Sequence, residues 1–279
     1  MFNTIIYERE EAIVIIYLNR PEVLNAMNRL MWNELDEALN LAEKDPEIKV
    51  LIFTGKGRAF SSGADLKESP KRTKQEYREY LEKLQRVSLR LIEFPKPTIA
   101  AINGYALGSG YELALACDIR IAAEDALIGS PEAKVSSSVT GGATKLLIDL
   151  IGPAKAKELI FTAEFINGKE AERIGLVNKA VRLEDLMKEA INMAKKIAQN
   201  SPLSIKLIKK LLNIAKETSL NSIMQYEVEA CLNTVFSEER LERIKEFEQR
   251  KRKERDNEGR IYNQHRKSGW TEQRREKKA

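Results

Sequence analysis

Histidine and cysteine are scarce in this chain of 279 residues, and their scarcity argues against several kinds of active site. The single histidine, His265, lies near the C-terminus, so a histidine-based catalytic triad, a two-histidine zinc site and a histidine general base are poorly supported. Cys117 and Cys231 are too few for a disulfide framework, and no Cys-x-x-Cys pattern suggests a metal site. Acid–base chemistry must therefore fall to carboxylates, lysine or tyrosine.

Long hydrophobic runs are also missing. No apolar run follows the first residues, and the most apolar stretch, residues 98–116, is interrupted by Asn103 and Glu112. We therefore expect a cytoplasmic protein that does not contact a membrane. With 43% hydrophobic residues, the chain can bury one substantial core.

The net charge of +5 is concentrated at the C-terminus. Residues 250–279 contain twelve Lys or Arg and five Asp or Glu, which leaves residues 1–249 with a net charge of −2. A basic tail can bind phosphate, but a solvated extension is the commoner case. Binding to nucleic acid is therefore not expected.

Hydrophobic patterns predict strands alternating with helices, followed by helices alone. We expect strands near residues 12–18, 50–54, 98–102, 119–123 and 176–181, with a glycine-rich loop over residues 55–66. Predicted helices cover residues 28–42, 73–93, 111–116, 144–151, 154–162 and 168–174. No strand is expected after Leu183. The predicted division is an α/β core over residues 1–195, a helical region over 196–250 and a basic tail over 251–279.

Three motifs carry a family resemblance. They are Arg-Ala-Phe-Ser-Ser-Gly-Ala-Asp-Leu at 58–66, Ile-Asn-Gly-Tyr-Ala-Leu-Gly-Ser-Gly-Tyr-Glu-Leu at 102–113 and Gly-Ser-Pro-Glu at 129–132. In this order and spacing they resemble the enoyl-CoA hydratase/isomerase family, also called the crotonase family. The resemblance runs from Leu-Asn-Arg-Pro at 18–21 and Leu-Asn-Ala-Met at 24–27 to about Phe236.

The resemblance implies an α/β fold built as a spiral of repeated strand–strand–helix units, with C-terminal helices that assemble a homotrimer or homohexamer. It also implies an oxyanion hole made by the backbone N–H groups of Ala64 and Ser109. Bonds to a thioester oxygen that strengthen as negative charge develops lower the barrier to reaction. Glu112 and Glu132 match the two glutamates that hold the attacking water and deliver a proton in the hydratases.

The same resemblance assigns a coenzyme A site. Its expected residues are Ala26, Ser62, Gly63, Ala64, Asp65, Leu66 and Lys67. Because coenzyme A is part of an acyl-CoA thioester substrate, neither a separate cofactor nor a metal is expected. Lys56 and Arg58 could bind phosphates, although solvated loop charges are the commoner reading of each. Asp65 could instead fix the loop by backbone hydrogen bonds.

Two positions depart from the family pattern. Ser109 replaces the middle glycine of a Gly-Gly-Gly sequence, which keeps the backbone N–H if the backbone tolerates a Cβ. Thr140 replaces a glycine of the loop that positions the water. With the three serines at 136–138, it predicts a polar or short acyl pocket.

The resemblance is closest to the enoyl-CoA hydratases, which add water reversibly to a 2-enoyl-CoA to give a 3-hydroxyacyl-CoA. The alternative within the family is an isomerase or another acyl-CoA enzyme. Outside it, an RNA-binding protein on the crotonase scaffold and a purely structural oligomer are the rival hypotheses. For Glu112 the rival is a structural ion pair with Arg120.

Overall fold

The computed structural model describes residues 2–68, 72–245, 247–249 and 251. The chain divides into two compact units, Met1–Thr218 and Ser219–Ala279. The sequence predicted a boundary at residue 195 because no strand was expected beyond it. The boundary at Thr218 instead follows from the contacts between residues, so the two boundaries describe different properties. Among the described residues, the last strand ends at Val181, as the sequence indicated.

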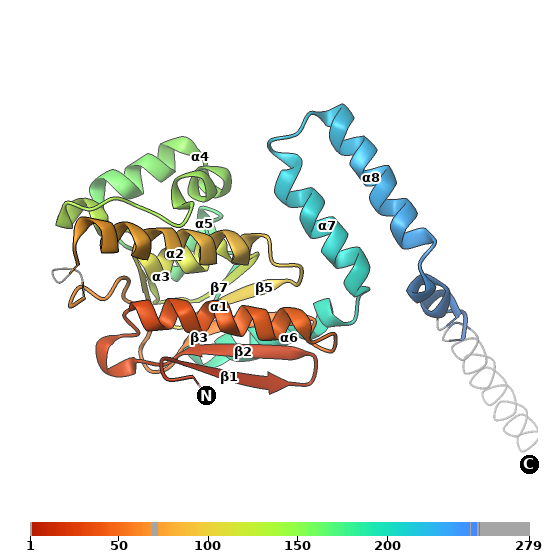
Figure 1. Cartoon of the computed structure of the whole chain (residues 1–279), viewed down its shortest axis with the longest axis horizontal. Coiled ribbons are helices and arrows are strands. Elements are labelled where there is room, and N and C mark those ends of the chain that lie inside the picture. Colours follow the sequence, from red (N-terminus) through yellow and green to blue (C-terminus); the bar gives the residue numbers. More distant parts are fainter. Residues whose placement is uncertain (1, 69–71, 246, 250, 252–279) are drawn as a thin grey trace, which may run out of the picture. The chain divides into compact units, whose positions relative to one another are not determined.

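A six-stranded sheet forms the centre of the first unit (Figure 1). Its order is β1-β2-β3-β5-β7-β10, in which β1 pairs antiparallel with β2 and the other neighbours are parallel. The strands are β1 (Ile5–Glu10), β2 (Ile13–Leu18), β3 (Val50–Gly55), β5 (Thr98–Ile102), β7 (Ile119–Ala123) and β10 (Lys179–Val181).

Short strands make a second sheet with the order β4-β6-β8-β9. They are β4 (Ala59–Ser61), β6 (Tyr105–Leu107), β8 (Leu127–Gly129) and β9 (Ile166–Asn167). Three times in succession, the chain passes from a strand of the large sheet to a strand of the small sheet and then to helical structure. This repetition is the strand–strand–helix spiral that the family resemblance implied.

Local signals in the sequence fix where most helices begin. The N-cap side chains of Asn28, Asn167, Ser201 and Ser219 accept a hydrogen bond from the first turn of a helix, and Thr73 and Glu76 form a capping box. The helices are α1 (Arg29–Lys44), α2 (Lys74–Ile92), α3 (Ser109–Ala116), α4 (Ala143–Thr162), α5 (Gly168–Arg173), α6 (Leu183–Ala198), α7 (Pro202–Ala215) and α8 (Leu220–Val235).

The large sheet has an apolar core on each of its two faces. Successive residues of a strand point to opposite faces, so one strand contributes to both cores. Val14, Ile16 and Leu18 belong to a core shared with α1, α2 and α3. Their neighbours Ile13 and Ile15 belong to a second core with Leu186, Ala190 and Ala194 of α6. A run of β-branched residues therefore fills two layers.

Two predicted segments differ from the structure. The loop predicted over 55–66 contains β4, whose three residues are too few to show a period. The strand predicted over 176–181 forms only at Lys179–Val181, since Leu176 and Val177 are drawn into the core beside α5. The two helices predicted at 144–151 and 154–162 are confirmed, because α4 is interrupted between them at Gly152, whose φ of 75° and ψ of 163° are not helical.

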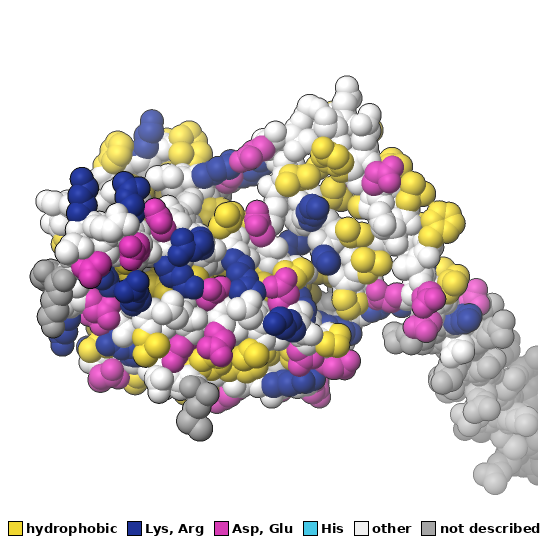
Figure 2. Space-filling model, in the orientation of Figure 1, with side chains coloured by type: hydrophobic (Ala, Val, Ile, Leu, Met, Phe, Trp, Pro, Cys, Tyr) yellow, Lys and Arg dark blue, Asp and Glu magenta, His cyan; other side chains and the backbone are white. Residues whose placement is uncertain are grey.

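No helix of the described residues is both long and apolar enough to cross a lipid bilayer. Lys/Arg and Asp/Glu side chains are interspersed over α1 and α2 (Figure 2). Asp36 on α1 pairs there with Lys83 and Arg90 of α2. This face therefore has no large area of one charge.

Candidate active site

Glu112 lies in α3, a helix whose eight residues are all buried. Its carboxylate accepts two hydrogen bonds from Thr140. The Thr140 N–H donates to Oε1, and the hydroxyl donates to Oε2 at 2.7 Å. The ion pair with Arg120 that the sequence left open is not formed, because Arg120 donates to the carbonyls of Leu176 and Cys117 instead.

Glu132 is the first residue of a short 3-10 helix, Glu132–Val135, that follows β8. Its Oε2 accepts a hydrogen bond from the hydroxyl of Ser130, which is itself buried. Its Oε1 faces Gly108, because a Cβ at Gly108 would lie 2.8 Å from that oxygen. Glycine at 108 therefore leaves room for the carboxylate beside the start of α3.

The two glutamates are close enough to influence each other. Burial raises the pKa of Glu112 from its ordinary value of 4.5 to about 6; the hydrogen bonds from Thr140 oppose that rise and the charge of Glu132 adds to it. Glu112 is therefore largely ionised at pH 7 although it is only 2% exposed. A buried carboxylate with a raised pKa suits proton transfer near neutral pH.

The two expected oxyanion donors lie on backbone segments that touch. A Cβ at Gly63, where φ is +101°, would lie 2.9 Å from the carbonyl oxygen of Leu107 and 3.5 Å from Cα of Gly108. Only glycine allows this approach, which brings Ala64 next to Ser109. Neither the Ala64 N–H nor the Ser109 N–H donates to an acceptor within the described part of the chain.

Ser109 also shows why a side chain is tolerated in the Gly-Ser-Gly turn. The positive φ lies at Gly108, and Ser109 begins α3 with helical geometry. The first N–H groups of a helix have no partner within it and point along the positive end of its dipole. The Ser109 N–H is therefore suited to bind a developing negative charge.

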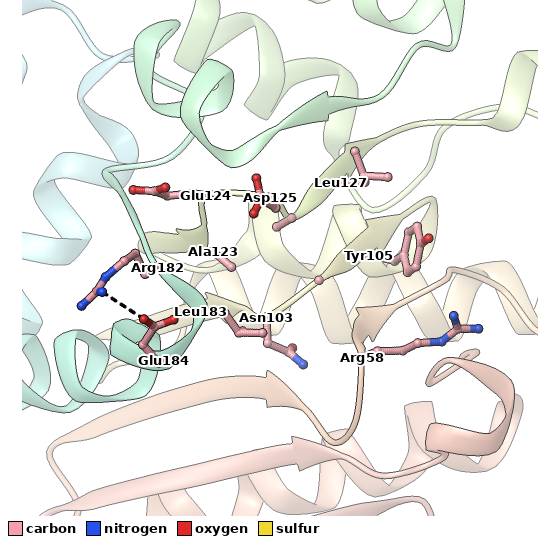
Figure 3. Close-up of a pocket in the computed structure, with 12 residues that line it drawn as sticks. Arg58, Asn103, Tyr105, Ala123, Glu124, Asp125, Leu127, Arg182, Leu183 and Glu184 are labelled. Carbon is pink, nitrogen blue, oxygen red and sulfur yellow. Dashed lines mark ion pairs between the residues drawn. The ribbon is translucent and has the colours of Figure 1, made fainter.

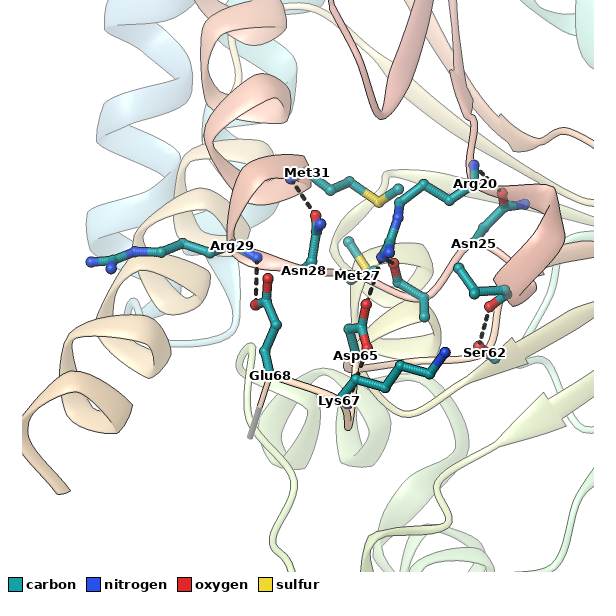
Figure 4. Close-up of polar contacts among 12 residues, drawn as sticks. Arg20, Asn25, Met27, Asn28, Arg29, Met31, Ser62, Asp65, Lys67 and Glu68 are labelled. Carbon is teal, nitrogen blue, oxygen red and sulfur yellow. Dashed lines mark hydrogen bonds and ion pairs between the residues drawn. The ribbon is translucent and has the colours of Figure 1, made fainter. Parts of the chain in front are cut away.

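The loop that carries Ala64 is braced from the opposite side (Figure 4). Arg20 donates to Oδ2 of Asp65 at 2.8 Å and to the carbonyl of Ala26 at 2.6 Å. Met27 forms a parallel bridge with Ala64, since its N–H binds the Gly63 carbonyl and its carbonyl accepts the Asp65 N–H. This bridge leaves the Ala64 N–H pointing away from Met27.

Some of the expected coenzyme A residues take part in the hydrogen bonds that hold the loop, and others are exposed at the surface. Ser62 donates from its backbone N–H to Leu24 at 2.9 Å, and the buried Ala26 accepts from Arg20. Leu66 and Lys67 are exposed, and the Lys67 N–H binds Oδ1 of Asp65. Asp65 thus holds the loop through two sets of hydrogen bonds, as the structural alternative for it predicted.

Two loop cations have separate surroundings. The amine of Lys56 lies 3.6 Å from the centre of the Tyr17 ring. Arg58 lines a polar cavity of about 560 Å³ with Tyr105, and Glu124 and Asp125 lie on its far side (Figure 3). This cavity contains none of the predicted catalytic or coenzyme A residues.

The predicted polar acyl pocket needs a correction at Thr140. Its hydroxyl donates its proton to Glu112 and therefore has no proton left to donate to a substrate chain. The three serines at 136–138 are exposed. The side chains that were expected to make the pocket polar are therefore directed to other partners or to the surface.

Sequence reasoning gave no role to Arg20, Asn25 or Ser130. Asn25 is completely buried, has a positive φ of 56° and donates to the carbonyls of Lys56 and Ala59. Arg20 and Asn25 belong to motifs that carried the resemblance, so their position there was the available signal. For Ser130, the only signal in the sequence was its position two residues before Glu132, a candidate catalytic residue.

Potential metal ligands do not cluster in the part of the chain that the structure describes, where no group of three or more His, Cys, Asp or Glu is arranged to hold an ion. Residues 252–279 of the basic tail, for which no binding to nucleic acid was expected, lie outside the described residues.

Comparison with known proteins gives consistent matches. The sequence model of the enoyl-CoA hydratase/isomerase family matches residues 8–257. A crotonyl-CoA hydratase of Syntrophomonas wolfei is 42% identical over 208 residues, covering 74% of this chain and 80% of the relative. A short-chain-enoyl-CoA hydratase of Clostridium acetobutylicum is 42% identical over 206 residues, covering 74% and 79%.

Among solved structures, an enoyl-CoA hydratase from Bacillus anthracis superposes with a TM-score of 0.86 at 35% identity. The match covers 89% of this chain and 97% of that structure. The spiral of strands and helices is therefore the crotonase fold.

Proposed function

Because this chain belongs to the enoyl-CoA hydratase/isomerase family, we propose that it uses Glu112 and Glu132 to add water reversibly to a 2-enoyl-CoA thioester. The chain is an enoyl-CoA hydratase, and its substrate is an acyl-CoA thioester. One observation carries the assignment of the site. The Glu132 carboxylate and two backbone N–H groups that have no acceptor among the described residues lie around Gly108, and Glu112 is close enough to Glu132 to feel its charge.

The reaction begins with the thioester carbonyl. Its oxygen accepts hydrogen bonds from the N–H groups of Ala64 and Ser109, and the dipole of α3 adds to their effect. Electron density then moves from the conjugated double bond toward that oxygen, so the β-carbon becomes open to attack by water. Losing one such donor in other enzymes costs on the order of 3 kcal/mol of transition-state stabilisation.

The glutamates then move protons. Glu112, ionised above a pKa of about 6, accepts a proton from water as the carbon–oxygen bond forms. Oε1 of Glu132, the oxygen that faces Gly108 beside the carbonyl site, delivers a proton to the α-carbon. The proton that Glu112 took from the water then replaces it on Glu132, so one water is added and both glutamates return to their starting state. The same groups in reverse remove water from a 3-hydroxyacyl-CoA.

Coenzyme A enters as part of the substrate, and no separate cofactor or metal takes part in the proposed reaction. The backbone of residues 62–67 is the proposed coenzyme A contact, together with Ala26 beneath it. A short acyl group is the proposed substrate. The names of the crotonyl-CoA and short-chain relatives support it, whereas Thr140 no longer does.

Assembly and location belong to the same proposal. A homotrimer or homohexamer is supported by α7, where Lys209 is the only buried residue and the apolar residues stay half-buried or exposed. A cytoplasmic location is supported by Cys117 and Cys231, which are both free thiols.

The activity is tested by incubating the protein with crotonyl-CoA and analysing the thioester by mass spectrometry. Hydration increases the mass by one water and removes the absorbance of the conjugated double bond. An isomerase would leave the mass unchanged when given a 3-enoyl-CoA. Hydration of crotonyl-CoA no faster than in a control without protein would reject the proposed function.

A further inference from the structure

Each glutamate of the proposed site accepts a hydrogen bond from a side-chain hydroxyl. The Thr140 hydroxyl donates to Oε2 of Glu112 at 2.7 Å, and the Ser130 hydroxyl donates to Oε2 of Glu132. These two donors come from different segments, one just after β8 and one just before α4. The Thr140 contact spans 28 residues and is a product of the fold, whereas the Ser130 contact is local and spans two residues.

Both hydroxyls bind Oε2 of their glutamate, but the Oε1 atoms of the two glutamates differ in their contacts. At Glu132 the Ser130 bond occupies Oε2, so Oε1 remains directed at Gly108 and the oxyanion donors. At Glu112 the Thr140 N–H adds a bond to Oε1. One residue therefore holds both oxygens of Glu112 and fixes the plane of the carboxylate, while each oxygen keeps a further lone pair.

The other neighbours of Glu112 do not supply a positive charge. From α2, the Ser88 hydroxyl is 1% exposed and has no hydrogen-bond partner among the described residues; a Cβ at Gly141 would lie 3.3 Å from it and 3.5 Å from Oε2 of Glu112. From beyond β8, Glu132 acts on Glu112 as a like charge. Arg120 is turned toward backbone carbonyls.

We propose that Thr140 and Ser130 are positioning residues for hydration. Each holds one glutamate through its hydroxyl, and Ser130 thereby leaves Oε1 of Glu132 to meet the substrate. This inference rests on the proposed function. In it, the threonine that replaces the family's glycine acts through Glu112 and supplies a hydrogen bond that glycine cannot provide.

The Thr140 hydroxyl also has an effect on charge. A donor to the ionised form of a carboxylate favours that form, whereas burial and the charge of Glu132 disfavour it. With no cation paired to Glu112, the two bonds from Thr140 are the groups that counter burial. Removing the hydroxyl should therefore raise the pH at which Glu112 becomes ionised.

The test compares Thr140→Val, Thr140→Ser and Thr144→Val with the wild type in crotonyl-CoA hydration from pH 5 to 9. Thr140→Val keeps the N–H and the branched shape but lacks the hydroxyl, and Thr140→Ser restores the hydroxyl. Thr144→Val makes the same chemical change at an exposed position of α4. The titration of the substrate is the same for all four proteins, so it cancels in the comparison.

We expect the acid limb of kcat/KM to move up by about one pH unit in Thr140→Val alone. Its loss of kcat/KM should then be about fivefold larger at pH 6 than at pH 8.5. Thr140→Ser and Thr144→Val should follow the wild type. An unchanged acid limb in Thr140→Val, or an equal shift in Thr140→Ser, would overturn the role of Thr140 while the wild-type activity still supports the proposed function.

Ser130→Ala tests the second hydroxyl. Freeing Oε2 of Glu132 lets the carboxylate rotate, so kcat should fall about tenfold with KM changed less than twofold, as for a group that acts in the transition state. An unchanged kcat, or a loss confined to KM, would overturn the role of Ser130. Failure of the wild type itself to hydrate crotonyl-CoA would reject the proposed function and this inference with it.

Discussion

At the scale of single residues, the ionised Glu112 should lower the stability of the folded protein. Its pKa rises from 4.5 to about 6 on folding, so the folded state binds a proton more tightly than the unfolded state. Stability contributed by this residue is therefore present below pH 4.5 and is lost as the pH rises through 6. The loss amounts to about 2 kcal/mol.

Glu112→Gln cannot ionise and should avoid this loss. The stability of the variant relative to the wild type should increase by about 2 kcal/mol between pH 4 and pH 7. Urea denaturation at several pH values measures this difference. A difference that stays constant over that range would show that Glu112 has the same pKa in both states.

Tertiary contacts explain why sequence reasoning reached Glu112 and Glu132 but not the groups that hold them. The two glutamates lie in recognisable motifs, and the apolar surroundings of Glu112 already indicated burial. The Thr140 contact crosses 28 residues of chain, and the Arg20–Asp65 contact crosses 45. No period or local turn signal encodes such contacts.

At the scale of elements, the oxyanion loop should depend on the pair formed by Arg20 and Asp65. Burial would raise the pKa of Asp65, but hydrogen bonds from Arg20 and the Lys67 N–H outweigh it and hold the pKa below its usual value. Both side chains are mostly buried, so breaking the pair should displace the loop that carries Ala64.

We expect Asp65→Asn to reduce kcat/KM about tenfold or more, because small displacements of a catalytic group are costly. Steady-state kinetics with crotonyl-CoA measures the effect. Glu170→Gln, which breaks an exposed pair with Arg173 on α5, is the matched control and should stay within about twofold. Equal activity of the two variants would show that the Arg20–Asp65 pair does not position the loop that carries Ala64.

Element prediction succeeded where patterns were long. The strands of the large sheet from β2 to β7 and the helices α1, α2 and α5 were evident from β-branched runs and helical periods. The small sheet was missed because each of its strands has three residues or fewer, which is too short to show alternation. Only the family resemblance indicated a second strand in each repeat.

At the scale of the whole molecule, assembly should involve the apolar stripe of α8. Leu220, Met224, Val228, Leu232 and Phe236 recur every four residues and are all exposed in the second unit. Residues four apart lie on one face of a helix, and hydrophobic side chains gather over α8 in Figure 2. An exposed stripe of this length favours burial against another copy of the chain.

Val228→Glu combined with Leu232→Glu should therefore convert the assembly to monomers. Light scattering at micromolar concentration measures the mass, and Asn233→Glu, placed away from the stripe, should leave it unchanged. A wild-type protein that is already monomeric would contradict the proposed trimer or hexamer.

The basic tail should be dispensable for the chemistry. Its composition is highly charged with few core-forming residues. Deleting residues 256–279 should leave turnover at saturating substrate within about threefold, with any loss appearing in KM and sensitive to salt. A truncated protein that folds and assembles but loses its turnover would show that the tail helps to form the active site.

The central claim is that Glu112 and Glu132 together hydrate the enoyl thioester, and the most direct measurement is turnover of crotonyl-CoA by Glu112→Gln and Glu132→Gln beside the wild type. Each variant should fold and bind the substrate, yet lose about 100-fold or more in kcat, as expected when positioned acid–base catalysis is removed. Near-normal turnover in either variant would contradict the two-glutamate mechanism.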